Sequence, residues 1–378
     1  MSRRLHQLIG AGVGLSALVL AGCAAPTEES NDTTTTAGGA VSASQATSAE
    51  DFGGMEELVA AAEAEGKLNI IALPPDWANY GEIIDAFQAT YDIVIDSAQP
   101  DASSQEEINA ADQLAGTDRA PDVFDLGQSV ALANTDMFAP YKVETWDTIP
   151  DVFKDPDGVW VNDYGGFMSI GYDSAKVPAI TALDDLLGEG FRGMVALNGD
   201  PTQAGAAFSG VMMASIARGG SADDIAPGVA FFKELNDAGN FLPVDPTPAT
   251  IESGQTPVVI DWDYLNASLA KNLPTWTVVV PENATVAGYY FQAINTDAPH
   301  PAAARLWQEF LFSDEGQNLW LKGGARPVRA DAMAEAGTID QGLFDALPVV
   351  AGDPVIPTPD QTATAAAYLA ENWAMVVG

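Results

Sequence analysis

The chain has 378 residues, of which 47% are hydrophobic, and this is enough for two packed lobes with separate cores. Acidic residues outnumber basic residues by 53 to 15, so the formal net charge is −38. This balance excludes nucleic acids as partners, because binding a phosphate backbone needs clustered Lys and Arg. The same acidity is typical of a solvated surface that keeps an exported protein soluble, and it identifies no partner.

The N-terminus has the order of parts found in an export signal. Arg3 and Arg4 come first, and residues 8–20 are apolar or small but too few to span a bilayer comfortably. The letters LAGC, ending at Cys23, resemble the bacterial lipobox, in which the cysteine becomes the lipidated first residue. We predict a lipoprotein signal peptide over 1–22 and lipidation of Cys23. The alternative is a stray cysteine after an ordinary signal peptide.

Residues 24–50 contain no aromatic residue and include four consecutive threonines among Ser, Gly and Ala. A segment of this composition buries too little surface to fold. We therefore predict that residues 23–50 are the lipidated cysteine and a disordered tether. The chain would then be an extracytoplasmic protein that is lipid-anchored at the outer face of the cell membrane or in the periplasm.

From Met55 onward, the spacing of apolar residues alternates between helical and extended patterns. Gly66 ends the first helix, and Pro121 precedes the third strand. The first part of the body is predicted to contain helices over 55–65, 80–90 and 104–114 and strands over 67–73, 93–97 and 123–126. This alternation implies an α/β fold with a mostly parallel sheet that helices cover on both faces.

The rest of the body continues the same pattern without an internal repeat. Strands are predicted over 194–197, 257–261, 276–280 and 288–294, and helices over 206–217, 230–237, 301–312, 314–322 and 363–373. A loop rich in Gly, Pro and Thr separates the strand that ends at 197 from the next helix.

Several segments resemble periplasmic binding proteins. The strand and helix over 67–87 are similar to their opening pair, the letters PDV at 121–123 to their third strand, and residues 165–173 to their approach to the second lobe. The segment AARLWQEFLFSDEG at 303–316, followed by RPV at 326–328, resembles the group that includes polyamine-, ferric-iron-, thiamine- and phosphonate-binding proteins. The resemblance covers nearly all of 55–378.

This resemblance implies a two-lobed periplasmic-binding-protein fold of type 2, in which each lobe is a mostly parallel sheet flanked by helices and a ligand is trapped by hinge closure. We expect the chain to cross between the lobes near 165–172 and 281–288. The implied division is 51–170 plus 286–345 for lobe one and 171–285 plus 346–378 for lobe two. The implied partners are the permease and ATPase subunits of an ABC transporter, with the protein itself a monomer.

In open α/β sheets, ligands lie beyond the carboxyl ends of strands, so the loops at these ends hold the candidate residues. The first loop contains Asp76, Trp77 and Tyr80. An acid beside aromatic rings suits a cation with an apolar body, through charge pairing and attraction to the ring faces. The alternative is a capped helix start with a packed tryptophan.

Two further loops precede helices. Ser103 and Ser104 could hold an anion through their hydroxyls and the backbone N–H groups of the helix N-terminus. Thr202 stands in a loop that ends at Gly205 and resembles the anion-facing loop of the iron and phosphonate members. Simple helix capping is the alternative for both loops.

The most specific candidate is the segment Asp261, Trp262 and Asp263. In an extended chain, the two acids share one side and Trp262 faces the other, and carboxylates beside aromatic rings fit ammonium groups. Helix caps with core aromatics are the alternative. Tyr289 and Tyr290 resemble the phenolate pair of ferric-binding relatives, although they lie later in the chain. Strand alternation predicts that at most one of them reaches the cleft.

Motifs for catalysis or for a resident metal or cofactor are absent from the mature sequence, in which His300 is the single histidine and no cysteine other than Cys23 exists. We therefore interpret the chain as a solute-binding lipoprotein, not an enzyme, that captures a polyamine or related cationic amine for an ABC importer. Three alternatives stay open: a binder of an anionic ligand or chelated ferric iron, an acidic-residue surface hydrolase acting on saccharide, and a structural surface lipoprotein.

Overall fold

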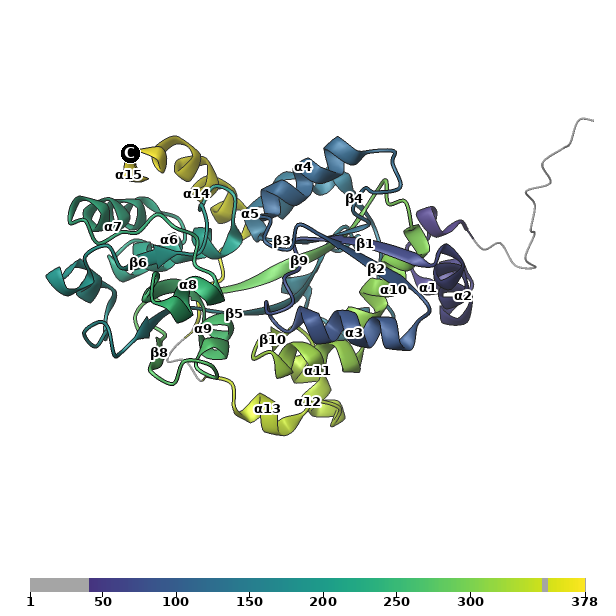
Figure 1. Cartoon of the computed structure of the whole chain (residues 1–378). Helices are drawn as coiled ribbons and strands as arrows, with labels where there is room; N and C mark the ends of the chain where they lie inside the picture. The colour runs from purple at the N-terminus through teal and green to yellow at the C-terminus, as the bar shows by residue number, and fades with distance from the viewer. Residues whose placement is uncertain (1–40, 349–352, 378) are drawn as a thin grey trace, which may run out of the picture. The chain divides into compact units, whose positions relative to one another are not determined.

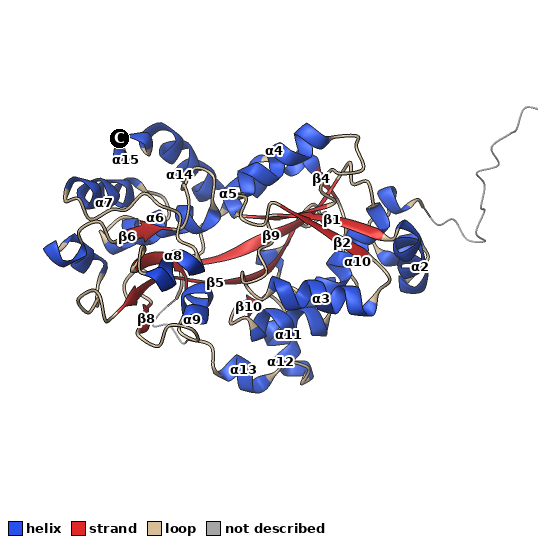
Figure 2. Ribbon diagram, viewed as in Figure 1, coloured by secondary structure: helices blue, strands red, loops and turns tan. Residues whose placement is uncertain are grey.

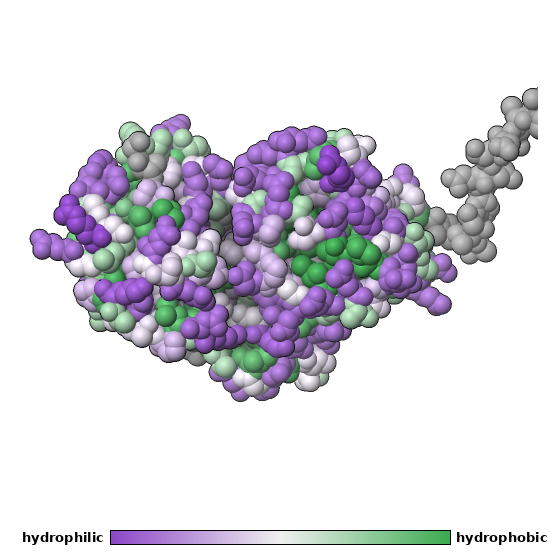
Figure 3. All heavy atoms as spheres, viewed as in Figure 1, coloured by the Kyte–Doolittle hydropathy of each residue, from purple (hydrophilic) through white to green (hydrophobic). Residues whose placement is uncertain are grey.

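The structure is a computed structural model that describes residues 41–348 and 353–377. Residues 40–378 form one compact unit. The predicted signal peptide, the lipidated Cys23 and the tether as far as residue 40 lie outside the described residues. Figure 3 shows hydrophilic residues over most of the visible face of the described part, as the acidic composition predicts.

The body is a mixed α/β structure in which helices cover the sheets (Figures 1 and 2). The strands are β1 (Lys67–Ile71), β2 (Val94–Ala98), β3 (Val123–Leu126), β4 (Phe138–Ala139), β5 (Val161–Asp173), β6 (Val195–Leu197), β7 (Val258–Trp262), β8 (Trp276–Val279), β9 (Ala287–Asn295) and β10 (Arg326–Pro327). β1 and β2 form a parallel pair, and the other eight strands form one sheet in the order β3-β9-β5-β7-β6, to which β4, β8 and β10 attach.

The helices come between the strands and after them. They are α1 (Ala49–Phe52), α2 (Met55–Glu65), α3 (Tyr80–Thr90), α4 (Ser104–Leu114), α5 (Gln128–Ala133), α6 (Gly205–Ala217), α7 (Ala226–Asp237), α8 (Pro248–Ser253), α9 (Asp263–Leu269), α10 (Pro301–Leu311), α11 (Asp314–Lys322), α12 (Ala330–Ala336), α13 (Gln341–Asp345), α14 (Pro359–Asn372) and α15 (Ala374–Val377). Short 3₁₀ turns lie between several of them.

β5 is the long strand that both halves of the large sheet share. From Val161 to Phe167 it pairs with β9, and from Met168 to Asp173 it pairs with β7 and β8. All thirteen of its residues are buried, as expected for a central strand that is covered on both faces. We call the elements around β1–β4 lobe one and those around β6–β8 lobe two. The residue boundaries predicted for the lobes remain a proposal.

The sense of the strands is mixed rather than mostly parallel. β1–β2 and β6–β7 are parallel, as the strand–helix alternation predicted. The pairings of β3, β5, β7 and β9 with one another are antiparallel. β5 and β9 run in opposite directions between the lobes, and strands that run in opposite directions pair antiparallel. The right-handed crossover rule concerns parallel strands only, so it does not apply to this pair.

The last residues of the predicted tether belong to the folded body. Residues 43–45 form a 3₁₀ turn, α1 begins at Ala49, and Ala46 is fully buried. The buried guanidinium of Arg305 on α10 donates to the carbonyl oxygens of Ala46 at 2.9 Å and of Ser44 at 3.2 Å. These bonds hold a segment whose own composition would leave it disordered, so residues 43–50 belong to the folded body and not to a tether.

Candidate functional site

The two lobes touch where β5 and β9 cross between them. Gly127, at the end of β3, and Gly205, the first residue of α6, approach so closely that a Cβ on Gly127 would lie 2.6 Å from the Gly205 Cα. A cavity of about 20 Å³, enough for roughly one water molecule, lies beside this contact. Its lining comes from both lobes and from β9: Gly127, Gln128, Ser129, Gly205, Phe208, Ser209, Trp262, Ala287, Gly288, Tyr289, Tyr290 and Pro357.

Trp77 reaches this junction from the loop after β1. Its indole N–H donates to the hydroxyl of Tyr164 on β5 at 2.8 Å. Its ring stands perpendicular to the rings of Tyr290 and Tyr264, with centroids 5.7 and 6.5 Å away. Because Tyr264 lies on α9 and Trp77 follows β1, this ring contact joins the two lobes.

Tyr80 lies next to Tyr164, with ring centroids 6.1 Å apart, and is fully buried. Its hydroxyl donates to Oδ2 of Asp125 at 2.6 Å and accepts from Nε2 of Gln292 at 3.0 Å. The hydroxyl of Tyr164 donates to the same Asp125 oxygen at 3.1 Å. The series of hydrogen bonds that starts at Trp77 therefore ends at the buried carboxyl group of Asp125 on β3.

Asp261 and Trp262 end β7 at the junction. The carboxylate of Asp261, 6% exposed, accepts from the side chain of Asn198 at 2.9 Å and from the backbone N–H of Trp262 at 2.8 Å. Burial raises the pKa of Asp261 to about 7. The indole N–H of Trp262 donates to the hydroxyl of Tyr290 at 3.3 Å, which connects the end of β7 to β9.

Asp263 does not continue the strand, so the prediction that Asp261 and Asp263 share one side of an extended chain is wrong. β7 ends at Trp262, and Asp263 is the first residue of α9. Its Oδ1 accepts from the backbone N–H groups of Phe167 at 2.9 Å and of Tyr264 at 3.1 Å, which stabilises the helix start against β5. Burial raises the pKa of Asp263 to about 6.

Tyr289 and Tyr290 both border the cavity, whereas ideal strand alternation predicted at most one. The ring of Tyr289 packs on Phe153 with centroids 4.3 Å apart, and the Tyr290 ring is stacked on Tyr164 at 5.4 Å. The pairing of β5 with β9 shifts register between Asn162 and Gly165, next to these tyrosines. Such an irregularity changes the direction of neighbouring side chains.

Two of the predicted residues, Ser103 and Thr202, have local roles. Ser103 caps α4 in a reciprocal arrangement with Glu106, and Thr202 donates twice to Asp200 in an exposed turn. Asp76 is exposed in the loop before Trp77. Ser104 lies nearer the junction, since its hydroxyl accepts from the backbone N–H of Gly127 at 2.9 Å.

The sequence analysis missed the acids at the centre of the junction. Asp125 lies within β3, Asp163 lies within β5, and both are almost completely buried. The available signal was a carboxylate inside an apolar strand, VFDL at 123–126, because acids are rarely fully buried without a partner or a function. Tyr164, Tyr264 and Gln292 were also missed, since nothing local distinguishes them from core residues.

Several oxygens in this region have no donor among the described residues. They are Oδ1 of Asp125, Oδ2 of Asp163, Oε1 of Gln292 and the hydroxyl of Tyr264. A buried polar atom without a partner costs about 1–3 kcal/mol, so four of them in one place require an explanation. No ion pair in the described part of the chain involves Asp125, Asp163 or the neighbouring Glu107.

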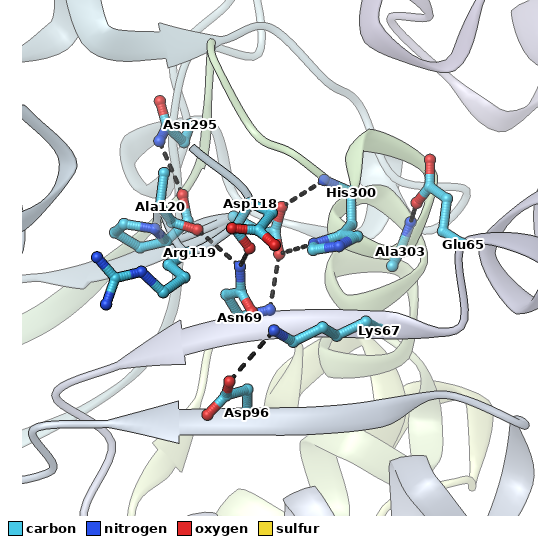
Figure 4. Close-up of polar contacts among 12 residues, drawn as sticks. Glu65, Lys67, Asn69, Asp96, Asp118, Arg119, Ala120, Asn295, His300 and Ala303 are labelled. Atoms are coloured by element: carbon cyan, nitrogen blue, oxygen red, sulfur yellow. Dashed lines mark hydrogen bonds and ion pairs between the residues drawn. The ribbon is translucent and has the colours of Figure 1, made fainter. Parts of the chain in front are cut away.

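A second polar cluster lies at the opposite end of β3 (Figure 4). The fully buried carboxylate of Asp122 accepts from Nδ1 of His300 at 2.9 Å, from the backbone N–H of His300 at 2.7 Å and from that of Asn69 at 2.6 Å. Glu65 accepts from the backbone N–H groups that begin α10. These bonds tie β1, β3 and α10 together, so we interpret the cluster as structural.

The hydrogen bond to Asp122 raises the pKa of His300, with nearby Glu65 acting in the same direction and Lys67 in the opposite one. A histidine whose pKa is raised by folding stabilises the native state fully below its unfolded pKa, and this contribution is lost as pH rises through the folded pKa. We expect His300→Asn, which keeps an N–H donor but does not titrate, to remove on the order of 1 kcal/mol at pH 6 and much less at pH 8.5. Urea unfolding at the two pH values measures this difference, and an equal loss at both would contradict it.

Within 41–348 and 353–377, no group of three or more His, Cys, Asp or Glu side chains is arranged to hold a metal ion. None of the helices described there is long and apolar enough to cross a membrane.

Solved structures with the same fold define the class of this protein. AfuA from Actinobacillus pleuropneumoniae, a periplasmic binding protein solved with fructose-6-phosphate, has a TM-score of 0.66 at 18% identity, covering 82% of this chain and 98% of its own. A ferric binding protein from Campylobacter jejuni has a TM-score of 0.60 at 18% identity, covering 82% of this chain and 99% of its own. The spermidine/putrescine substrate-binding protein PotD from Streptococcus pneumoniae has a TM-score of 0.55 at 14% identity, covering 82% of this chain and 99% of its own. The fold is thus the two-lobed type 2 fold of periplasmic binding proteins.

The sequence itself then gives the family. Residues 121–344, more than half of the chain, match the model of the bacterial extracellular solute-binding proteins. The chain belongs to this family, and an extracytoplasmic location follows from that membership. The resemblance inferred from the PDV segment and the late helix pair is confirmed. No curated protein matches the chain significantly.

Proposed function

We propose that this protein captures a small cationic amine, of the polyamine type, between its two lobes and delivers it to an ABC importer. The observation that carries the proposal is the gathering of buried carboxyl groups and aromatic rings at the contact between the lobes. Cationic ligands with an apolar body are recognised by this combination, because the carboxylates pair with the charge and the ring faces attract it.

The arrangement of the junction supports a cation more than an anion. Trp77, Trp262 and Tyr290 supply rings from the loop after β1, from β7 and from β9. Asp261 and Asp263 are buried beside them, and neither forms an ion pair with another described residue. Arg326 lies near enough to Asp263 to lower its pKa against the larger effect of burial, whereas no cationic side chain acts on Asp261, so the buried Asp261 carboxyl favours a ligand that brings positive charge.

We retain seven of the ten predicted residues as members of the proposed binding region, because they lie at or next to the junction: Trp77, Tyr80, Ser104, Asp261, Trp262, Asp263 and Tyr289. Ser103 and Thr202 are used in a cap and a turn, and Asp76 is exposed. These three are therefore weaker candidates for contact with a ligand.

One observation favours a second candidate, an anionic or chelated-iron ligand. The cavity beside Gly127 and Gly205 is lined by Ser129 and Ser209 and by the start of α6, whose first residues have no side-chain cap. Hydroxyls and free N–H groups at a helix start are suited to an anion. A ferric-binding relative and a relative solved with a sugar phosphate share the fold.

The remaining parts of the proposal follow from family membership and from the N-terminal sequence. We propose that the protein binds its solute without chemical turnover, acts as a monomer, and presents the loaded form to permease and ATPase subunits. We also propose that a lipid on Cys23 holds it at the outer face of the membrane.

A thermal-shift screen tests the proposed ligand class. A ligand present at one hundred times its Kd stabilises the native state by about 2.7 kcal/mol. We expect putrescine, spermidine or a related amine to raise the melting temperature, and phosphate, phosphonates and ferric citrate to leave it unchanged. Stabilisation by an anion with none by any amine would replace the first candidate by the second.

A further inference from the structure

At the centre of the junction lies a group of six buried residues, here called the acid–aromatic cluster. Its members come from α3, β3, β5, α9 and β9, and each is at most 7% exposed: Tyr80, Asp125, Asp163, Tyr164, Tyr264 and Gln292. Trp77 covers the cluster and is its partly exposed neighbour. The cluster was not among the predicted site residues.

The internal hydrogen bonds of the cluster leave acceptors unused. Tyr80 and Tyr164 both donate to one oxygen of Asp125, and the other oxygen has no donor within the described residues. Oδ1 of Asp163 accepts the backbone N–H of Tyr164 at 2.7 Å, and the side chain of Gln292 also lowers the pKa of Asp163 against the larger effect of burial, while Oδ2 has no donor within hydrogen-bond distance among the described residues.

The amide oxygen of Gln292 and the hydroxyl of Tyr264 likewise lack partners within the described residues. When Asp125 and Asp163 are ionised, three of the four unused atoms can only accept. In that state the group that completes the cluster must bring N–H or O–H donors, and in the protonated state the carboxyl O–H groups supply the donors that such a ligand replaces.

The charges in the cluster lead to the same conclusion. The groups that face Asp125 are Glu107, Asp163 and the hydroxyls of Tyr80, Tyr164, Tyr264 and Tyr290, and none of them is cationic. Burial raises the pKa of Asp125 to about 7 and raises those of Asp163 and Glu107 well above their usual range. Asp125 is therefore partly protonated near pH 7, and a cation that binds beside it would displace that proton.

We propose that Asp125 and Asp163 receive the N–H groups of a primary or secondary ammonium ligand, and that the ligand releases protons from this pair when it binds. This inference rests on the proposed function and names the part of the ligand that is recognised. A quaternary ammonium has charge but no N–H group, so it leaves the unused acceptors unpaired and binds more weakly.

Trp77 controls access to the cluster. Its indole N–H already donates to the hydroxyl of Tyr164, and its ring lies against Tyr264 and Tyr290. The loop that carries it contains three residues with positive φ that are not glycine: Ala72, Ala78 and Asn79. Because the other members of the cluster are buried, we place the entry of the ligand at Trp77, whose N–H would leave Tyr164 as the ligand binds.

Calorimetric titration of the full-length chain tests this inference with three probes: putrescine, its hexamethylated bis-quaternary analogue, and inorganic phosphate. We expect putrescine to bind at least tenfold more tightly than the quaternary analogue. Titration at pH 7 in two buffers with different ionisation enthalpies should show net proton release. Asp125→Asn and Asp163→Asn should each weaken putrescine binding at least tenfold and reduce the proton release.

Asp85→Asn is the matched control, because Asp85 is exposed on α3 and the substitution removes the same single negative charge. It should alter the affinity for putrescine less than twofold. Tyr264→Phe keeps the inference testable if an aspartate variant fails to fold, because it removes a hydroxyl that has no partner in the described structure. It should leave the melting temperature unchanged and still weaken putrescine binding.

The outcomes separate the inference from the proposed function. Putrescine binding that is insensitive to Asp125→Asn, Asp163→Asn and Tyr264→Phe overturns the inference and leaves the amine function standing. Equal affinity for putrescine and its quaternary analogue does the same. Binding of phosphate with none of putrescine overturns both.

Discussion

Replacing Gly127 with alanine should weaken putrescine binding at least tenfold while the protein remains folded. The backbone at Gly127 has φ −64° and ψ 146°, which any residue adopts, so the substitution adds no backbone strain. The new Cβ would lie 2.6 Å from the Cα of Gly205, whereas carbon atoms in contact prefer about 3.5–4.0 Å. The lobes must then stay about 1 Å further apart, and the rings and acids at the junction cannot close on a ligand.

The effect should depend on the size of the side chain and on its position. Gly127→Leu should weaken binding further and enlarge the radius of gyration measured by X-ray scattering in the presence of putrescine. Gly342→Ala is the matched control, because its new Cβ meets only Asp340 Oδ1 at 3.4 Å, an ordinary contact on α13. Unchanged affinity in both Gly127 variants would mean that this contact does not limit closure.

Local sequence signals predicted the regular elements of the body well. α2, α3, α4 and α11 have the predicted bounds, and β3 does as well. Their ends are set by neighbours in the chain. The capping pair Ser103 and Glu106 begins α4, and Gly66, with φ 67°, ends α2. Each of these helix ends is determined by residues no more than four positions away in the sequence.

The junction could not be predicted in the same way, because its contacts are distant in the chain. Asp125 is 45 residues from Tyr80, and Tyr80 is 212 residues from Gln292. The sequence analysis named Trp77 and Trp262 at strand ends and Tyr289 on a predicted strand, but it could not place Asp163 and Tyr164 on a shared strand between the lobes. The start of α9 at Asp263 was also missed, since its first turn is held by the backbone of Phe167 on β5.

Glu309→Gln should stabilise the protein at pH 8 and change little at pH 4. Glu309 lies on α10 and is 6% exposed. Its two oxygens accept from the hydroxyl of Tyr141 at 2.7 Å and from the backbone N–H of Glu144 at 2.9 Å, and burial raises its pKa from 4.5 to about 7. The native state therefore keeps a proton that the unfolded chain releases. The free energy of unfolding falls as pH rises from about 4.5 to about 7 and is constant above that range.

A glutamine at 309 preserves both hydrogen bonds, because its amide nitrogen can donate to the hydroxyl of Tyr141 while its oxygen accepts from Glu144. The gain at pH 8 should be on the order of 3 kcal/mol, the free energy that corresponds to the shift of the pKa. Urea unfolding between pH 4 and pH 8 measures it, with Glu335→Gln on α12 as an exposed control that loses the same charge. If the free energy of unfolding changed with pH by the same amount in the wild type and in Glu309→Gln, the buried carboxyl would not be the source of the pH dependence.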